Sequence, residues 1–239
     1  MLAPFIASAN RWGFDARWAY VAMAVPPLGV LVLPGIYLLN RDLFAALMDE
    51  DRVVESLQFA AFAASALLSA WIARDRWTNG HRWQASLFAL AALALIFISG
   101  EEISWGQRIL GFEAPEGLRE INEQDELTVH NISGVLLAFN LGMLVTSLYA
   151  MVAEPIARLI RISDRWPHAT FLFAPPLFLA PAFAVTAGFR LLRLIVLDGG
   201  YRTNRIGEWA ELCFAAALAI FLMLCWRRLR KSHAADLRS

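Results

Sequence analysis

Two adjacent carboxylates, Glu101 and Glu102, close a long apolar run in the segment GEEISWGQR at 100–108. Acidic side chains within or at the edge of a membrane are costly, and they are usually kept for a partner, an ion path or chemistry. Neighbouring residues of a helix point about 100° apart, so both carboxylates can hardly serve one centre. We take Glu102 as the interior residue and Glu101 as its alternative. The segment therefore predicts a site without identifying a reaction.

Further acidic, amide and imidazole side chains lie at the ends of other apolar runs. They are Glu55 at the start of the second run, His130 and Asn131 at the start of the fourth, and Glu208 and Glu211 at the start of the sixth. If successive helices alternate in direction, all of these ends meet Glu102 at one face of the membrane. Glu208 and Glu211 are three residues apart, which places them on one helical face. We therefore predict one polar site built from several helices.

Carboxylates from several helices together with an imidazole resemble the donor set of a metal site in a helical bundle. The predicted metal ligands are Glu55, Glu102, His130, Glu208 and Glu211. Di-iron carboxylate proteins use a Glu-x-x-His pair on each of two helices. Here Glu126 and His130 are four residues apart, and no second histidine matches them. A divalent metal is a candidate cofactor, and the donor types do not choose among zinc, iron, manganese and calcium.

The same side chains suit acid–base catalysis. A dry pocket favours the protonated form of one carboxylic acid, while a charged or coordinated neighbour keeps another ionised. Glu102 and His130 are the predicted catalytic residues. Gln107, Arg108 and Asn131 are predicted to position a substrate or the loop. This chemistry fits a hydrolase that acts on a lipid, peptide or other amphiphilic substrate at the outer leaflet.

Two other interpretations stay open, so the sequence does not decide whether the chain is an enzyme. Arginines expected on the same face could pair with the acids and dock a loop, which would make the chain a non-catalytic subunit or scaffold. These arginines are Arg108, Arg190, Arg193 and Arg205. Ion or proton transport, or sensing, would need charges through the depth of the membrane. The inner halves of the apolar runs carry almost none, which makes transport the weakest reading.

Composition indicates what must position these residues. The chain has 239 residues, of which 59% are hydrophobic and 18% charged, and its mean hydropathy is +0.51. Soluble domains are typically about 45–50% apolar and about 25% charged. Crossing a bilayer takes about 20 apolar residues. Runs of that length lie at 18–39, 53–73, 85–104, 131–153, 170–197 and 208–226.

We therefore predict an all-α fold, a polytopic transmembrane helix bundle of about six spans that forms one membrane domain over 1–239. Pro175, Pro176 and Pro181 predict a break in the fifth span, with 187–197 a second short helix, because proline removes a backbone donor. Membrane lipid is the expected partner, other membrane subunits are further candidates, and nucleic acid is not expected.

The distribution of charge predicts the orientation. Lys and Arg gather before the first span, between the second and third, between the fourth and fifth, and in the tail, which places both termini in the cytoplasm. The segment 100–131 carries eight Asp or Glu against two Arg. We expect 105–130 to be a periplasmic loop with a short interfacial helix near 115–121. The arginines of 190–205 argue against this scheme, because it places them outside.

The run GEEISWGQR, followed by N-x-Q-x-E-x(3)-H-N at 122–131, resembles a signature of uncharacterised bacterial polytopic inner-membrane proteins. The resemblance covers the third span, the loop and the start of the fourth span. It implies a multi-pass protein of the bacterial inner (cytoplasmic) membrane, and it implies no activity. The motif of CAAX-type intramembrane proteases, Glu-Glu-x-x-x-Arg with a later Phe-x-x-x-His, does not match. Gly106 replaces its arginine and Glu126 its phenylalanine.

Overall fold

The structure, a computed structural model, describes residues 2–49, 52–106, 133–162, 167–195 and 200–236. Helices make up most of these residues, and no strand occurs among them. The elements in chain order are α1 (Ala3–Arg11), α2 (Ala16–Leu39), α3 (Arg41–Met48), α4 (Val53–Thr78), α5 (Arg82–Glu102), the 3₁₀ turn η1 (Ser104–Gly106), α8 (Ser133–Leu159), α10 (Pro167–Phe173), the 3₁₀ turn η2 (Leu177–Leu179), α11 (Ala180–Ile195) and α12 (Gly200–Asp236).

Six helical segments in the described part of the chain are long and apolar enough to cross a membrane. The third segment ends at Glu102, and the sixth spans Thr203–Ser232. The prediction of an all-α, polytopic bundle of about six spans is therefore confirmed. The short helices α1 and α3 were not predicted, because each is too short and too mixed in composition to stand out as an apolar run.

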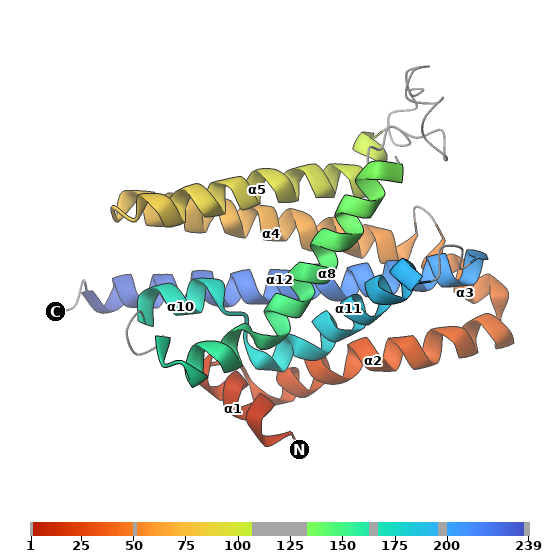
Figure 1. The fold of residues 1–239 in the computed structure, drawn as a ribbon, viewed down its shortest axis with the longest axis horizontal. Coiled ribbons are helices and arrows are strands. Elements are labelled where there is room, and N and C mark those ends of the chain that lie inside the picture. The colour runs from red at the N-terminus through yellow and green to blue at the C-terminus, as the bar shows by residue number, and fades with distance from the viewer. Residues whose placement is uncertain (1, 50–51, 107–132, 163–166, 196–199, 237–239) are drawn as a thin grey trace.

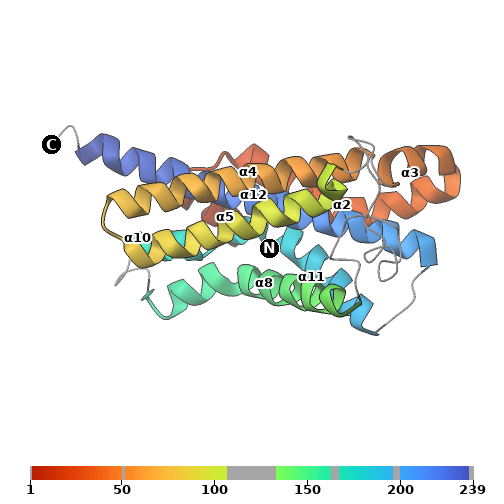
Figure 2. The ribbon, with the colours of Figure 1, turned by 90° about the horizontal axis from the view of Figure 1, so that it is seen from above.

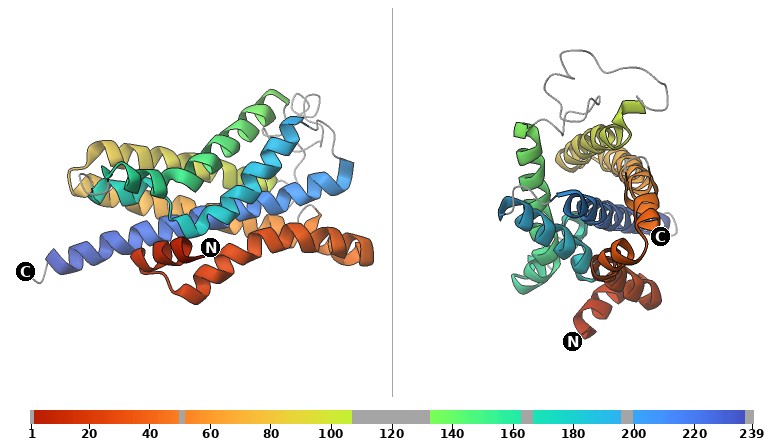
Figure 3. Two further views of the ribbon diagram at one scale, coloured as in Figure 1. Left: turned by 60° about the horizontal axis from the view of Figure 1, so that its bottom comes forward. Right: turned by 90° about the vertical axis from the view of Figure 1, so that its right-hand side faces the viewer.

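The spans run up and down along one axis, so alternate helix ends meet at the same end of the bundle (Figure 1). α12 lies at the centre when the molecule is viewed along that axis (Figure 3). It packs against α4 on one side and against α11 and α2 on the others, while α8 packs against α11. The view from above shows α8 and α11 on one side of the bundle, with α8 crossing it obliquely (Figures 1 and 2).

Burial separates the central helices from those that face lipid. The most apolar windows of the fifth and sixth spans bury 61% and 50% of their residues, whereas that of α2 buries 17%. Lipid tails are as apolar as these side chains, so a membrane helix does not have to pack them against protein, and α2 can expose them to lipid. The main core instead gathers large side chains that are fully buried, such as Phe62, Ile72, Phe178, Phe183 and Leu224.

Local sequence explains where several helices begin. Asp15 caps α2 by accepting a hydrogen bond from the Arg17 backbone N–H at 2.8 Å. Asn40 ends α2 and caps α3 by accepting from the Leu43 N–H at 2.9 Å. Both are the side-chain types that satisfy the free N–H groups of a first helical turn. α12 has 37 residues and is therefore about 55 Å long, so it extends beyond a bilayer core of roughly 30 Å.

The fifth span is interrupted. α10 ends at Phe173, the residues 174–176 are not helical, and η2 leads into α11 at Ala180. Pro175 and Pro176 lie in the gap, and their missing N–H groups explain why one helix cannot continue. The expected break is thus present, but the second helix begins at Ala180 and not at 187.

One close approach depends on glycine. A Cβ added at Gly29 of α2 would lie 2.1 Å from Cε2 of Trp209 on α12. The missing side chain lets the indole lie against α2, where its Nε1 donates to the Pro26 carbonyl at 3.0 Å. The Trp209 contact therefore holds α2 against the central helix.

Candidate functional site

Three helices bring four carboxylates to one end of the bundle. Glu55 lies in the first turn of α4, Glu102 is the last residue of α5, and Glu208 and Glu211 lie near the start of α12. The Glu102 carboxylate interacts electrostatically with Glu211, Glu208 and Glu55. We call these four residues the acidic cluster, and the end of the bundle that holds them the acidic end.

α4 and α12 are joined beside the cluster by Gln58, which is completely buried. Its Nε2 donates to the backbone carbonyl of Glu208 at 2.7 Å and to the Glu208 Oε2 at 3.2 Å. Its Oε1 is buried without a hydrogen-bond partner in the described structure. Gln58 therefore fixes the position of Glu208 and leaves one acceptor free beside it.

Arg190 of α11 is a buried positive charge that acts on Glu102 of the cluster, and 4% of it is exposed. Its Nη2 lies 2.5 Å from Oε1 of Glu211. Its Nη1 donates to Asn140 Oδ1 of α8 at 2.7 Å, and Nη2 also contacts Met143 Sδ at 3.1 Å. The buried Nε has no hydrogen-bond partner within the described part of the chain. One guanidinium thus ties α11 to both α12 and α8.

Two other arginines that the sequence places on this face, Arg193 and Arg205, have different contacts. Arg193 donates to Asn204 Oδ1 at 3.0 Å, and Arg205 Nε lies 3.9 Å from Asp49 Oδ1. The prediction that arginines and acids pair at this end therefore holds for Glu211, and its partner is Arg190. A variant that tests this pairing by exchanging the two charges must therefore exchange Arg190 with Glu211. Arg193 is not a suitable partner for the exchange, because it contacts Asn204.

Glu101 and Glu102 face different surroundings, as the 100° between adjacent helical residues requires. Glu101 accepts a hydrogen bond from the Trp105 indole Nε1 at 2.6 Å, whereas Glu102 faces the acidic cluster. Trp105 has a left-handed backbone, with φ at 53°, and its ring packs on Phe97 with centroids 5.6 Å apart. The indole folds back over Gly100, where a Cβ would lie 2.9 Å from Cε3 of Trp105.

Several predicted site residues lie outside the described residues. These are Gln107, Arg108, His130 and Asn131, together with nearly all of the expected loop at 105–130. Of the five predicted metal ligands, the four glutamates are described and share the acidic end. No group of three His, Cys, Asp or Glu side chains within the described ranges is arranged to hold a metal ion.

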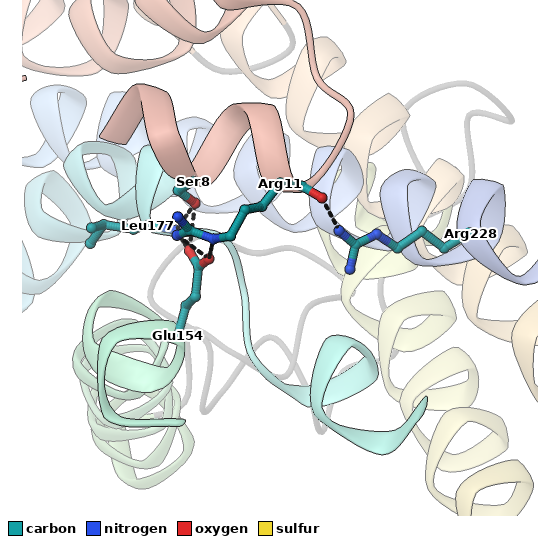
Figure 4. A network of polar contacts seen from close by, with 5 residues as sticks. All are labelled: Ser8, Arg11, Glu154, Leu177 and Arg228. Atoms are coloured by element: carbon teal, nitrogen blue, oxygen red, sulfur yellow. Dashed lines mark hydrogen bonds and ion pairs between the residues drawn. The ribbon is translucent and has the colours of Figure 1, made fainter. Parts of the chain in front are cut away.

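A second polar network, which was not predicted, lies toward the other end of the bundle, near the C-terminal ends of α8 and α12 (Figure 1). Figure 4 shows its contacts. Glu154 of α8 is 7% exposed and accepts from Ser8 Oγ at 2.5 Å, from Arg11 Nη2 at 2.7 Å and from the Leu177 N–H at 2.6 Å. Arg228 Nη2 of α12 donates to the Arg11 carbonyl at 2.5 Å. We call this end, which holds Arg11 and Arg228, the basic end.

The network at the basic end stabilises the backbone where the fifth span is interrupted. Leu177 begins η2, and Glu154 and Ser8 satisfy its N–H where no helical carbonyl can. The only feature of the sequence that pointed to this network is Glu154, an isolated acid between an apolar run and Pro155. The sequence does not show which residues Glu154 contacts, because Ser8 is 146 residues away.

Comparisons with family models, curated proteins and solved structures find no match to this chain. Its function must therefore be argued from the site itself.

Proposed function

We propose that this chain is a membrane-embedded enzyme whose acidic cluster performs acid–base chemistry on a lipid or other amphiphilic substrate. The observation that carries the proposal is the convergence of four carboxylates from three helices at one end of a membrane bundle.

The four carboxylates have unequal surroundings, which suits a division of roles. Glu211 is ion-paired with Arg190. Glu102 has three acids as neighbours, and a proton on Glu102 would relieve their mutual repulsion. Acid–base enzymes commonly place two carboxyl groups in environments that favour opposite protonation states. Glu102 is thus the proposed proton donor or acceptor, and His130 the second catalytic residue.

The position of the cluster supports an amphiphilic substrate. Glu102 ends one candidate span, and Glu208 and Glu211 lie near the start of another. We take the cluster to lie near the membrane boundary. A substrate held in the leaflet can present its polar group there. We further propose that the protein resides in a bacterial inner membrane with the acidic end toward the periplasm, as the positive-inside pattern of the sequence suggests.

A divalent metal is a secondary version of this proposal, and it depends on His130 joining the glutamates. Elemental analysis of detergent-purified parent protein separates the two versions. We expect little bound metal if the chemistry is acid–base alone. Near-stoichiometric metal that is lost in both Glu102→Ala and His130→Ala would establish the metal version instead.

The direct test uses the parent and the Glu102→Gln variant in vesicles made from the membrane lipids of the producing cells. Products are followed by mass spectrometry of the lipids. Loss of one general acid–base group typically costs about 10²- to 10⁴-fold in rate. We therefore expect a lipid species to be converted by the parent, and Glu102→Gln to slow its conversion at least a hundredfold.

The matched control is Asp42→Asn, which makes the same carboxylate-to-amide change at an exposed position of α3 outside the cluster. It should convert lipid at the parent rate. Parent-like conversion by Glu102→Gln would remove Glu102 from the mechanism. Absence of any product with the parent would favour the scaffold described next.

A non-catalytic scaffold is the second candidate, and the contacts of Arg190 favour it. This side chain joins α8, α11 and α12 through Asn140 and Glu211, as a structural clamp would. Exchanging the two charges, with Arg190→Glu and Glu211→Arg in one chain, separates the candidates. A scaffold should recover its function in the double variant, whereas an enzyme should fold and stay inactive.

A further inference from the structure

We propose that the basic end carries a second site, independent of the acidic cluster, which binds one anionic phospholipid from the surrounding leaflet. A cavity of about 240 Å³ opens there between α1, α8, α10 and α12. Its lining includes three arginines, Arg11, Arg158 and Arg228, beside the rings of Trp12 and Phe171. Arginine offers a planar set of donors that suits a phosphate oxyanion.

The charge of this cavity is positive after its acid is accounted for. Glu154 also lines it, and Arg11 neutralises that carboxylate with contacts of 2.7 and 3.2 Å. Ser8 and the Leu177 N–H bind the same carboxylate, so its oxygens are occupied. Arg158 and Arg228 therefore supply two further positive charges to whatever enters the cavity.

Arg228 is held in place before any ligand arrives. Its Nη2 donates to the Arg11 carbonyl at 2.5 Å, as Figure 4 shows. Its guanidinium carbon lies 4.1 Å from the centre of the Trp12 ring and 5.7 Å from that of Phe171. A side chain fixed in this way loses little conformational freedom when it binds an anion, which favours binding.

A second, apolar cavity adjoins the arginine-lined one. It has a volume of about 420 Å³ and shares three wall residues with its neighbour, Ala157, Thr170 and Ala174. Its other walls are almost entirely apolar and include Trp83 and Ile156. Together the two cavities fall in the range of roughly 300–1,000 Å³ typical of small-molecule sites.

The two adjoining compartments match the two halves of one molecule. A phosphate headgroup fits the arginine-lined cavity, and part of an acyl chain fits the apolar one. A free phosphate ion would use only the first, and a neutral lipid only the second. Basic pockets between transmembrane helices are known to bind anionic headgroups. The geometry therefore points to an anionic phospholipid as the occupant.

Native mass spectrometry of the detergent-purified full chain tests this site. Phosphatidylglycerol, phosphatidylcholine with the same acyl chains, and glycerol 3-phosphate are added separately at matched concentrations. We expect phosphatidylglycerol to stay bound, with affinity at least about tenfold higher than that of phosphatidylcholine. Glycerol 3-phosphate, which has the charge without the chains, should not be retained.

Two variants examine the two compartments. Arg158→Gln removes an exposed arginine from the arginine-lined cavity and should weaken phosphatidylglycerol binding about fivefold. Ile156→Trp narrows the apolar cavity and should also weaken phosphatidylglycerol binding. Because Ile156 is 48% exposed, folding should be unaffected. Arg17→Gln, an exposed arginine at the start of α2 that lines neither cavity, is the control and should bind as the parent does.

Each contrary result overturns the proposal in a different way. Equal binding of phosphatidylglycerol and phosphatidylcholine would show that the arginines do not select the headgroup. Retention of glycerol 3-phosphate as strong as that of the lipid would identify a phosphate site without a chain compartment. Unchanged binding in both Arg158→Gln and Ile156→Trp would place the lipid elsewhere on the protein.

Discussion

The guanidinium of Arg190 and the carboxylate of Glu211 form an ion pair across the α11–α12 interface, with 2.5 Å between Nη2 and Oε1. Their side chains are 5% and 17% exposed, so water contributes little to either charge. Removing one member of such a pair strands the other charge, which is costlier than replacing both by neutral groups.

We therefore expect Arg190→Met to lower the free energy of unfolding by roughly 3–5 kcal/mol. The double variant Arg190→Met with Glu211→Gln should recover much of that loss, because no charge is left alone. Denaturant titration in detergent micelles measures both values. Arg193→Met is the control and should change stability by about 0.5 kcal/mol or less, since Arg193 makes one exposed hydrogen bond to Asn204. A double variant as unstable as the single one would contradict the pairing.

Glu154 is expected to hold the interruption of the fifth span together. Glu154→Ala removes the acceptor of Ser8, Arg11 and Leu177 at once and should destabilise the protein by about 3 kcal/mol. Glu154→Gln keeps an acceptor oxygen and should cost less. Hydrogen–deuterium exchange of a peptide that covers Leu177 gives the local readout, and exchange there should rise most in Glu154→Ala. Unchanged exchange at this peptide would mean that η2 holds without Glu154.

The approach of Trp209 to α2 gives a prediction with an internal control. Gly29→Ala introduces a Cβ that would lie 2.1 Å from the indole, so the ring or the helix must move. Overpacking of this kind typically costs about 1–3 kcal/mol. Gly35→Ala on the same helix meets nothing within 4 Å and should be neutral, or stabilising by up to about 1 kcal/mol through helix propensity. The melting temperatures of the two variants are measured in the same detergent. Equal melting temperatures for Gly29→Ala and Gly35→Ala would argue against the close contact of Trp209 with α2.

The phenol of Tyr201 should titrate late. Its hydrogen bond to Asp49, with a smaller contribution from desolvation, raises the pKa of Tyr201 above the usual value. The folded chain therefore holds this proton more tightly than the unfolded chain does. The stability that results is fully present below the pKa of the unfolded phenol and is lost as pH rises through the pKa of the folded one.

Phenolate absorbance during an alkaline titration measures this effect, and the difference between the parent and Tyr201→Phe assigns it to one residue. Asp49→Ala removes the acceptor and should shift the Tyr201 titration to lower pH. An unshifted titration in Asp49→Ala would show that the hydrogen bond does not control this phenol.

Much of the architecture could be predicted from the sequence. The six apolar runs, such as 85–104 and 131–153, correspond to the six candidate spans, because crossing a membrane is a property of each run by itself. The prolines at 175 and 176 located the interruption of the fifth span for the same local reason. The four glutamates of the acidic cluster were also named beforehand, since acids at the ends of apolar runs are conspicuous.

The partners of these residues could not be predicted. Arg108, Arg190, Arg193 and Arg205 were equivalent as sequence, and only the packing of α11 on α12 and α8 decided that Arg190 meets Glu211. Likewise the sequence did not show that Glu154 contacts Ser8 and Arg11, because the fold brings these distant residues together.

The sequence by itself determined the class of this protein, a helical bundle in a membrane with acids at the ends of its spans. Hydropathy and backbone chemistry depend on a few neighbouring residues, so both can be read directly from the sequence. Tertiary structure decided which charges meet and which glycine admits an indole, as at Gly29 and Trp209. Those contacts depend on the rotation and crossing of helices far apart in the chain, and such angles follow from packing that no single segment contains.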